Sequence, residues 1–231
     1  MRTKALLSVA AIAASAISAM AQGNVYSLNI VGYATVTVNP GYNLLANPLD
    51  AGSTNSAASI MPIIDGEYVL TWNNGSFTEV IYDSTAGGWV QADDTTPSAP
   101  PSLPPGKGFF FFNPASTATN FTFVGQVVPG PGSSNTIPLT PGYSLVGSAL
   151  PAAVTTITNS PVSLPTILGM YILQWSNGKY TQVIYDTTVP GGPWVQADDT
   201  TPTTAPGYSI GSGVFIFNPN TTTVNWTQSL P

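Results

Sequence analysis

Six aspartates occupy matching places in two similar stretches of the chain, and they are the residues that could bind a metal. They are Asp83, Asp93 and Asp94 in the first stretch and Asp186, Asp198 and Asp199 in the second. Clustered carboxylate oxygens are the ligands that Ca²⁺ prefers, so a calcium site in each stretch is one interpretation. The other is that each Asp-Asp-Thr-Thr run ends a strand and hydrogen-bonds its own backbone. The chain lacks the D-x-D-x-D-G spacing of a calcium loop, which favours the second interpretation.

Paired carboxylates could also hydrolyse a glycosidic bond. That reaction needs two carboxyl groups at a suitable separation, one of them with a raised pKa. Asp93 and Asp94 are adjacent, and adjacent side chains of a strand point to opposite faces. The sequence offers no better pair, so a hydrolase is only the third hypothesis.

Aromatic side chains suggest sugar binding, because an exposed ring can stack on a pyranose by apolar contact. Trp89 and Trp194 follow glycine-rich turns, where they are better placed to be exposed than Trp72 and Trp175, although core packing is favoured for these aromatic residues as a set. The four candidates are Trp89, Tyr82, Trp194 and Tyr185. The alternative for all four is packing in a core. We expect core packing for Trp72 and Trp175, which share a strand face with tyrosine and leucine.

Composition excludes several kinds of chemistry. The 231 residues include no cysteine and no histidine, which rules out disulfides, thiol catalysis and a Ser-His-Asp triad. The net charge is −6, and only Lys107 and Lys179 are cationic beyond the N-terminal segment. A nucleic-acid partner is disfavoured, since phosphate binding needs a basic surface.

The N-terminus has the features of a secretory signal peptide. Arg2 and Lys4 precede an apolar run, Ala5–Ala19, and Ala19-Met20-Ala21 is a small-x-small cleavage site. Residues 1–21 are therefore predicted to be removed, which leaves Gln22 as the first residue. We expect an extracellular or cell-surface protein that is not inserted in the membrane after cleavage.

The two stretches with matching aspartates predict the fold. Residues 65–97 return at 168–202, and each copy alternates large apolar residues as a strand does (Tyr68 to Trp72 in the first). Asn74-Gly75 then favours a tight hairpin, Phe77–Asp83 returns as a second strand, and Trp89–Ala92 forms a third. Each copy is predicted to contain a three-stranded antiparallel meander.

Other segments extend each meander into an all-β module. Gly108–Asn113 and Gly213–Asn218 are continuous apolar runs, so both faces of these strands must be covered, most simply by a second sheet. Ser56–Ile64 could form a short helix. We expect two tandem, similar, mostly antiparallel β-sandwich-like modules or small barrels. The predicted boundaries are a first module at 22–128, a Pro/Gly linker at 129–134 and a second module at 135–231.

The ends of the two copies do not match in sequence. The first ends in a strand through Val124–Val128, for which the second has no evident equivalent, while the N-terminal strand Val25–Val38 is in surplus. That strand either covers an edge within its own chain or adds to the edge of another molecule and gives head-to-tail fibres.

The order of these motifs resembles a group of uncharacterised exported bacterial β-proteins. The resemblance is carried by the N-terminal VYSLNIVGY, by PGYNLLANPL, by the W-NG-YD-GGW meander and by PPGKGFFFFNP, and it covers nearly the whole chain after residue 21. It implies a secreted or surface β-protein and supplies no catalytic residue. Lys107 has no counterpart in Gly211-Ser212-Gly213, so a role for this lysine in both copies is not expected.

We therefore expect a secreted or cell-surface structural or adhesive protein, without enzymatic activity, that could self-associate through its N-terminal strand. The alternative hypothesis is a carbohydrate-binding protein that holds an extracellular polysaccharide by exposed aromatic rings. No cofactor is expected apart from the calcium considered above.

Overall fold

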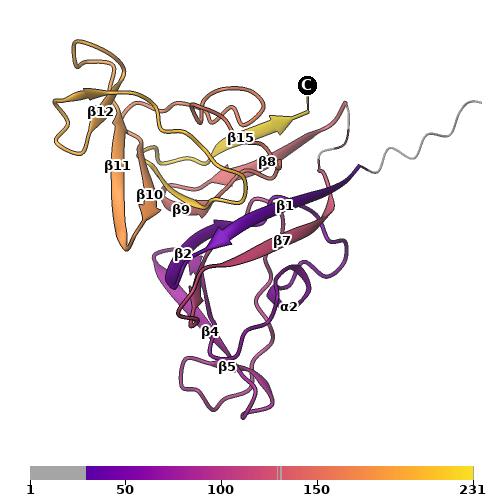
Figure 1. Ribbon diagram of the computed structural model, residues 1–231. Helices are drawn as coiled ribbons and strands as arrows, with labels where there is room; N and C mark the ends of the chain where they lie inside the picture. Colours follow the sequence, from indigo (N-terminus) through magenta and orange to yellow (C-terminus); the bar gives the residue numbers. More distant parts are fainter. Residues whose placement is uncertain (1–29, 129, 131, 231) are drawn as a thin grey trace, which may run out of the picture.

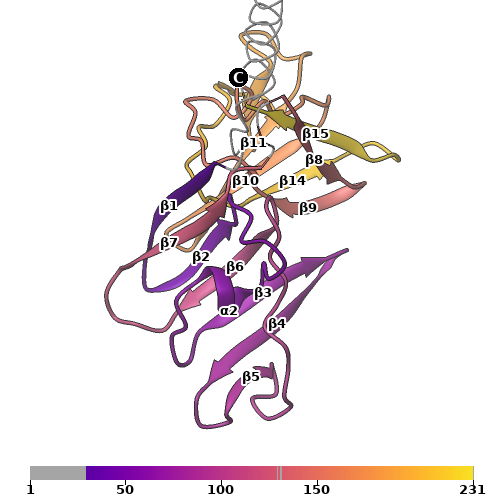
Figure 2. The same ribbon diagram turned by 90° about the vertical axis from the view of Figure 1, so that its right-hand side faces the viewer.

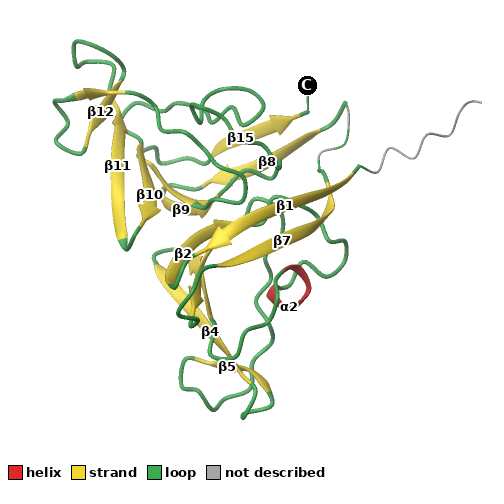
Figure 3. Ribbon diagram, viewed as in Figure 1, coloured by secondary structure: helices red, strands yellow, loops and turns green. Residues whose placement is uncertain are grey.

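The computed structural model describes residues 30–128, 130 and 132–230. Antiparallel strands dominate these residues, with one helical turn, α2 (Ala57–Ile60) (Figure 3). The all-β class predicted from the sequence is confirmed. The predicted signal peptide and the first part of the long N-terminal strand lie outside the described residues. No helix in the described ranges is long and apolar enough to cross a bilayer.

The first half of the molecule consists of a ribbon and a sheet (Figure 1). The ribbon pairs β1 (Val31–Val38) with β7 (Thr119–Gln126). The sheet has the strand order β2-β6-β3-β4-β5. Its strands are β2 (Gly41–Ala46), β6 (Gly108–Asn113), β3 (Tyr68–Asn73), β4 (Ser76–Asp83) and β5 (Gly88–Gln91).

The second half repeats this arrangement. Its ribbon pairs β8 (Ser134–Leu139) with β15 (Val224–Ser229), and its sheet has the order β13-β12-β11-β10-β14-β9. The sheet strands are β13 (Pro202–Thr203), β12 (Trp194–Gln196), β11 (Lys179–Tyr185), β10 (Tyr171–Ser176), β14 (Val214–Asn218) and β9 (Gly142–Val146). Corresponding strands pair in the same register in the two halves.

The predicted meander is confirmed in both halves. β3, β4 and β5 follow one another in the first sheet, and β10, β11 and β12 do so in the second. The hairpins turn at Asn74 and Asn177, whose φ angles of 45° and 50° are the left-handed values such tight turns require. The helix expected over Ser56–Ile64 is shorter than predicted, a single turn.

A hydrophobic core lies between the ribbon and the sheet of each half. In the first half, Val38, Phe121 and Phe123 of the ribbon pack with Phe109 and Phe111 of β6, and all five are fully buried. Trp226 of β15 is the largest buried side chain of the second core, with Ile137 of β8 beside it. The inward side chains of each ribbon therefore close one face of each sheet.

Part of the other face of each sheet is covered by the other half of the molecule. Phe110, on the face of β6 opposite to Phe109 and Phe111, is 6 % exposed and clusters with Leu44 of β2 and with Phe215 of β14. The prediction that the apolar run Gly108–Asn113 is covered on both faces by sheets is confirmed. Two ribbons thus enclose two sheets that pack against each other (Figure 2).

The apparent mismatch between the ends of the copies is a correction to the sequence analysis. All eight residues of β1 pair with β7 in the same chain, so β1 covers an edge internally. The second half is not short of a strand, because β8 and β15 form the equivalent ribbon. The equivalence was hidden because β8 (SNTIPL) shares one identical residue with β1, Thr136 in the place of Thr35, and carries a proline. β8 also begins at Ser134, the last residue of the predicted linker.

Candidate binding groove between the halves

Reciprocal hydrogen bonds join the two halves. The indole N–H of Trp72 donates to the backbone carbonyl of Tyr143, and that of Trp175 donates to the carbonyl of Tyr42, each at 2.9 Å. These two tryptophans are partly buried against the apolar cluster between the sheets. They pack in a core, as expected, but in the core shared by both halves.

Backbone hydrogen bonds bring the two halves still closer. The N–H of Ala46 donates to the carbonyl of Gly211 at 2.8 Å, and the N–H of Gly213 donates to the carbonyl of Leu44 at 3.0 Å. A Cβ atom at Gly213 would lie 2.5 Å from the carbonyl oxygen of Leu45. Only glycine permits this approach of the second half to β2.

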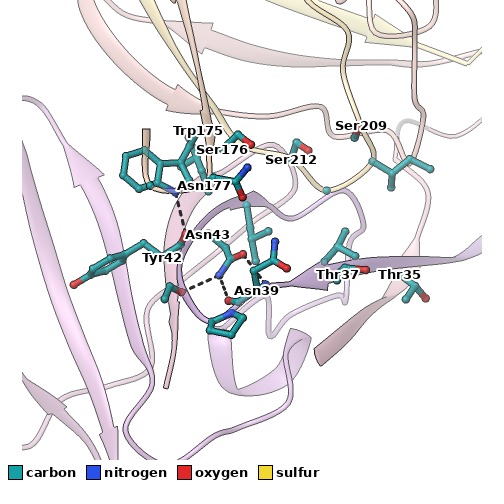
Figure 4. A pocket seen from close by; sticks show the side chains of 18 of the residues that line it. Thr35, Thr37, Asn39, Tyr42, Asn43, Trp175, Ser176, Asn177, Ser209 and Ser212 are labelled. Carbon is teal, nitrogen blue, oxygen red and sulfur yellow. Dashed lines mark hydrogen bonds between the residues drawn. The ribbon is translucent and has the colours of Figure 1, made fainter. Parts of the chain in front are cut away.

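A groove of about 690 Å³ lies where β1 and β2 face the second half; we call it groove 1 (Figure 4). The first half contributes β1 residues, the β1–β2 turn and β2, and the second half contributes the β10–β11 hairpin and the segment before β14. Its lining residues are Thr35, Val36, Thr37, Asn39–Leu45, Ala153, Trp175–Gly178 and Ser209–Ser212. None of them carries a formal charge.

The β1–β2 turn that forms one end of groove 1 is held by a buried amide. The side chain of Asn43 donates to the carbonyls of Asn39 and Gly41 at 2.7 and 2.9 Å, and it accepts the N–H of Asn39 at 2.9 Å. Asn43 is therefore occupied by the turn. Figure 4 shows the side chain of Asn39 beside it and that of Asn177 across the groove.

The outer edge of β1 borders groove 1 at Thr35–Thr37 and continues beyond the groove to Val31. Adjacent residues of an antiparallel strand direct their backbone groups to opposite sides. The carbonyl of Ile30 accepts from Val127 at 2.8 Å, so the even-numbered residues of β1 bond toward β7. The N–H and C=O groups of Val31, Tyr33, Thr35 and Thr37 therefore point away from β7. Among the described residues, β1 has no strand neighbour other than β7.

The second half has an equivalent groove of about 290 Å³, which we call groove 2. It is bordered by β8, by Trp72 and by Pro104–Lys107. Two differences in sequence distinguish it from groove 1. Pro138 of β8 takes the place of Thr37, as its pairing with Asn225 shows, and proline removes the outward N–H. Lys107, in the place of Ser212, donates to the carbonyl of Trp72 at 3.3 Å.

Groove 1 thus offers a strand edge that no strand of the described residues pairs with, beside neutral hydroxyl and amide side chains. Such an arrangement can bind an extended, uncharged chain through backbone hydrogen bonds. The sequence analysis did not identify it. The available signals were Pro138 in place of Thr37 and Ser209 in place of Pro104, differences that stand out in an otherwise repeated pattern.

The predicted carbohydrate-binding tryptophans are not in the groove, and the expectation that they are well placed to be exposed is wrong. Trp89 is 9 % exposed and lies in the first core, and Trp194 is 6 % exposed and lies in the second. The cause is register: Trp89 pairs with Tyr82 and Trp194 with Tyr185, on the face that the ribbon covers. Tyr82 and Tyr185 are half-buried, with ring centroids 5.5 and 5.1 Å from these tryptophans.

The predicted aspartates form turns. Asp93 accepts hydrogen bonds from the hydroxyl and N–H of Thr96 and from the N–H of Thr95, and these lower its pKa to about 2. Asp198 is bonded in the same way to Thr201 and Thr200, with the same pKa. The backbone-bonding interpretation is confirmed for both.

The remaining candidates for a calcium site do not gather with them. Asp83 and Asp186 each accept from the N–H and hydroxyl of a threonine two residues on, which lowers the pKa of both. Asp94 and Asp199 have left-handed φ angles of 60° and 58° in the turns. Across the described ranges, no three acidic side chains are close enough to hold a metal ion.

One buried acid was not singled out by the sequence analysis. Glu67 is 1 % exposed, and its carboxyl accepts the N–H of Ile64 at 2.8 Å. Burial raises its pKa to about 7, although the Ile64 bond acts in the opposite direction. At the same place in the second half, the sulfur of Met170 accepts the N–H of Ile167 at 3.3 Å. Glu67 therefore places an ionisable carboxyl group in a buried position that the apolar side chain of Met170 occupies in the second half.

Comparisons of the chain with family models, curated proteins and solved structures found no match. The function must therefore be argued from the geometry of the groove and from the sequence.

Proposed function

We propose that this chain is an exported structural or adhesive protein that acts by binding, without catalysis, and that self-associates through the outer edge of β1. The open edge of this strand carries the proposal. Proteins normally protect such an edge with proline, charge or a covering segment. β1 (VGYATVTV) contains no proline and no charged residue, whereas the equivalent β8 contains Pro138.

Exposed apolar side chains near the start of β1 support the same proposal. Tyr33 is 72 % exposed, Val31 is 57 % exposed, and Val124, which pairs with Tyr33, is 46 % exposed. Apolar residues grouped in this way on a strand edge mark a contact surface. Export is proposed from the basic residues, apolar run and cleavage site at the N-terminus.

The role of the outer edge of β1 in self-association is tested by Thr37→Pro, which introduces the residue found at the equivalent position of β8, Pro138. We expect the wild-type chain, purified after export, to grow in mass with concentration in light scattering and to form assemblies in electron micrographs. Thr37→Pro should remain monomeric, because it removes one outward N–H. Thr37→Val, which keeps that N–H and loses only the hydroxyl, should assemble as the wild type does. A wild-type chain that stays monomeric at high concentration would contradict the proposal.

Carbohydrate binding is the second candidate, and a different set of aromatic rings favours it. Tyr42, Phe112 and Tyr68 form a row across the first sheet, with ring centroids 5.0 and 4.9 Å apart. Tyr143, Phe217 and Tyr171 form the same row on the second sheet. Tyr42 and Tyr143 are 43 % and 40 % exposed, enough to stack on a sugar ring. A glycan array with tryptophan quenching tests this: Tyr42→Ala should weaken any signal, and Tyr42→Ala/Tyr143→Ala, which alters both rows, should abolish it.

A further inference from the structure

We propose that groove 1 binds residues 23–29 of a second copy of the chain, which add a strand to the outer edge of β1 and link molecules head to tail. This inference rests on the proposed function, since it names the segment through which the molecules associate. It differs from an exchange of β1 itself, because β1 remains paired with β7 in its own chain.

The chemistry of the groove fits this segment. An added strand must present backbone groups to Val31, Tyr33, Thr35 and Thr37 and must enter a groove lined by uncharged residues. The sequence GNVYSLN, residues 23–29, contains no charge and no proline, and it places Tyr26 and Leu28 on one face of a strand, opposite Val25, Ser27 and Asn29. At about 3.3 Å per residue, seven extended residues span ~23 Å, close to the length of the eight-residue β1.

The position of residues 23–29 in the chain favours binding to the β1 edge of another molecule over binding to the edge of their own β1. It directly precedes Ile30, whose carbonyl already bonds to Val127 at the start of the ribbon. To reach the outer edge of its own β1, the segment would need a tight reversal at Leu28–Asn29 or Asn29–Ile30. Two-residue hairpin turns need positive φ at both central positions (type I′) or at the first, where glycine is preferred (type II′). Residues 28–30 include no glycine, and leucine and isoleucine adopt positive φ only with strain.

Groove 2 does not provide a second site of this kind. Pro138 lacks the outward N–H that an added strand needs, and Pro104, Pro105 and Lys107 replace the residues that line groove 1 at Ser209, Ile210 and Ser212. Each molecule therefore has one segment to give and one groove to receive it. A contact between two different surfaces propagates as a filament unless its rotation closes a ring.

The test is a pair of charge variants in the segment, each adding two negative charges. Tyr26→Asp with Leu28→Asp places them on the apolar face, and Ser27→Asp with Asn29→Asp places them on the polar face. We expect the first variant to be monomeric by light scattering and the second to assemble. The mature N-terminus of each should be checked by mass spectrometry, because the changes lie near the predicted cleavage site.

Mixing variants provides a second measurement. The Tyr26→Asp/Leu28→Asp chain keeps its groove, and Thr37→Pro keeps its segment, so an equimolar mixture should form dimers and nothing larger. A synthetic peptide of residues 23–29 should also dissolve wild-type assemblies, whereas a scrambled peptide should not.

The outcomes separate this inference from the function on which it rests. If the wild type assembles and Tyr26→Asp/Leu28→Asp assembles equally well, the segment is not the occupant, and self-association stands without it. Loss of assembly in both charge pairs, or a mixture without dimers, also overturns the inference. If the wild type itself does not assemble, the proposed function is wrong.

Discussion

At the scale of single residues, Glu67 should control how stability depends on pH. Its pKa is about 7 in the folded protein and about 4.3 in an unfolded chain. The folded state therefore holds the proton more tightly, so the contribution of Glu67 to stability is greatest below about pH 4, falls as pH rises to 7, and then levels off. A shift from about 4.3 to about 7 corresponds to about 4 kcal/mol.

Glu67→Met, which installs the residue found at Met170, should remove this dependence. We expect the free energy of unfolding to be flat between about pH 5 and 8 and higher than that of the wild type at pH 8, measured by urea denaturation. Glu67→Gln is the control that keeps an acceptor for the Ile64 N–H. A wild type whose stability does not fall over this range would contradict the assignment.

Asp93 and Asp198 should titrate far below an ordinary aspartate. Both have a pKa of about 2, and the largest cause for Asp93 is the hydroxyl of Thr96. Since folding lowers their pKa, their contribution to stability is present above about pH 4 and is lost as pH falls through 2. In an NMR titration, Thr96→Val should raise the pKa of Asp93, while Thr95→Val should change it little because Thr95 acts mainly through its N–H.

The tryptophans show what the sequence reveals about single residues. The matching faces of Tyr68, Leu70 and Trp72 could be read from alternation. The burial of Trp89 could not, because the face on which it lies is set by its pairing with Tyr82 across a turn that includes Gly87 and Gly88. The glycine turn indicated where the chain reverses, but it did not fix the register between β4 and β5, which decides the face on which Trp89 lies.

At the scale of elements, buried asparagines tie each ribbon to its sheet. Asn113, at the end of β6, donates to the carbonyls of Val38 and Thr117 at 3.2 and 3.4 Å and is 1 % exposed. Asn113→Ala leaves the buried carbonyl of Val38 without that partner and should lower stability by about 2–3 kcal/mol. Asn120→Ala is the control, because Asn120 only accepts from Thr37 on the exposed face of the ribbon. Chemical denaturation of both variants measures the difference.

The glycine at the start of β14 should be essential for the contact between the halves. Gly213→Ala places a methyl group against the carbonyl of Leu45 and should destabilise the protein by about 1–3 kcal/mol. Gly130→Ala, where an added Cβ meets nothing within 4 Å, should be neutral. Equal melting temperatures for the two variants would show that the halves are less closely packed than the structure indicates.

Strands with strong alternation could be predicted from sequence, and the ribbon of the second half could not. β8 (SNTIPL) has two large apolar residues and a proline, so no strand signal rises above its surroundings. Its place is defined by long-range pairing with β15, including contact between the hydroxyls of Thr136 and Thr227 at 3.3 Å. That contact matches the one between Thr35 and Thr122 in the first ribbon.

At the scale of the whole molecule, the two halves share a third core in addition to their own. Leu44 and Phe110 from one half and Leu145 and Phe215 from the other are all less than 8 % exposed there. The sequence showed that Gly108–Asn113 needs cover on both faces. It did not show that the sheet covering the second face of this strand comes from the other half. An apolar run has the same composition whichever sheet packs against it.

This shared core predicts that the two halves unfold together. Trp72 and Trp175 lie at its border, with ring centroids 5.2 Å from Phe215 and 5.3 Å from Phe110 respectively. Calorimetry of the wild type should give one transition whose calorimetric and van't Hoff enthalpies agree. The double substitution Trp72→Ala/Trp175→Ala removes both rings and both indole hydrogen bonds between the halves, so the transition should separate into two. Tyr68→Ala/Tyr171→Ala, which removes two rings from the same strands away from these hydrogen bonds, should lower the melting temperature and leave one transition.

Two transitions in the wild type would mean that the ribbon and sheet of each half are stable without the other half, and that the apolar faces between the halves do not couple their unfolding.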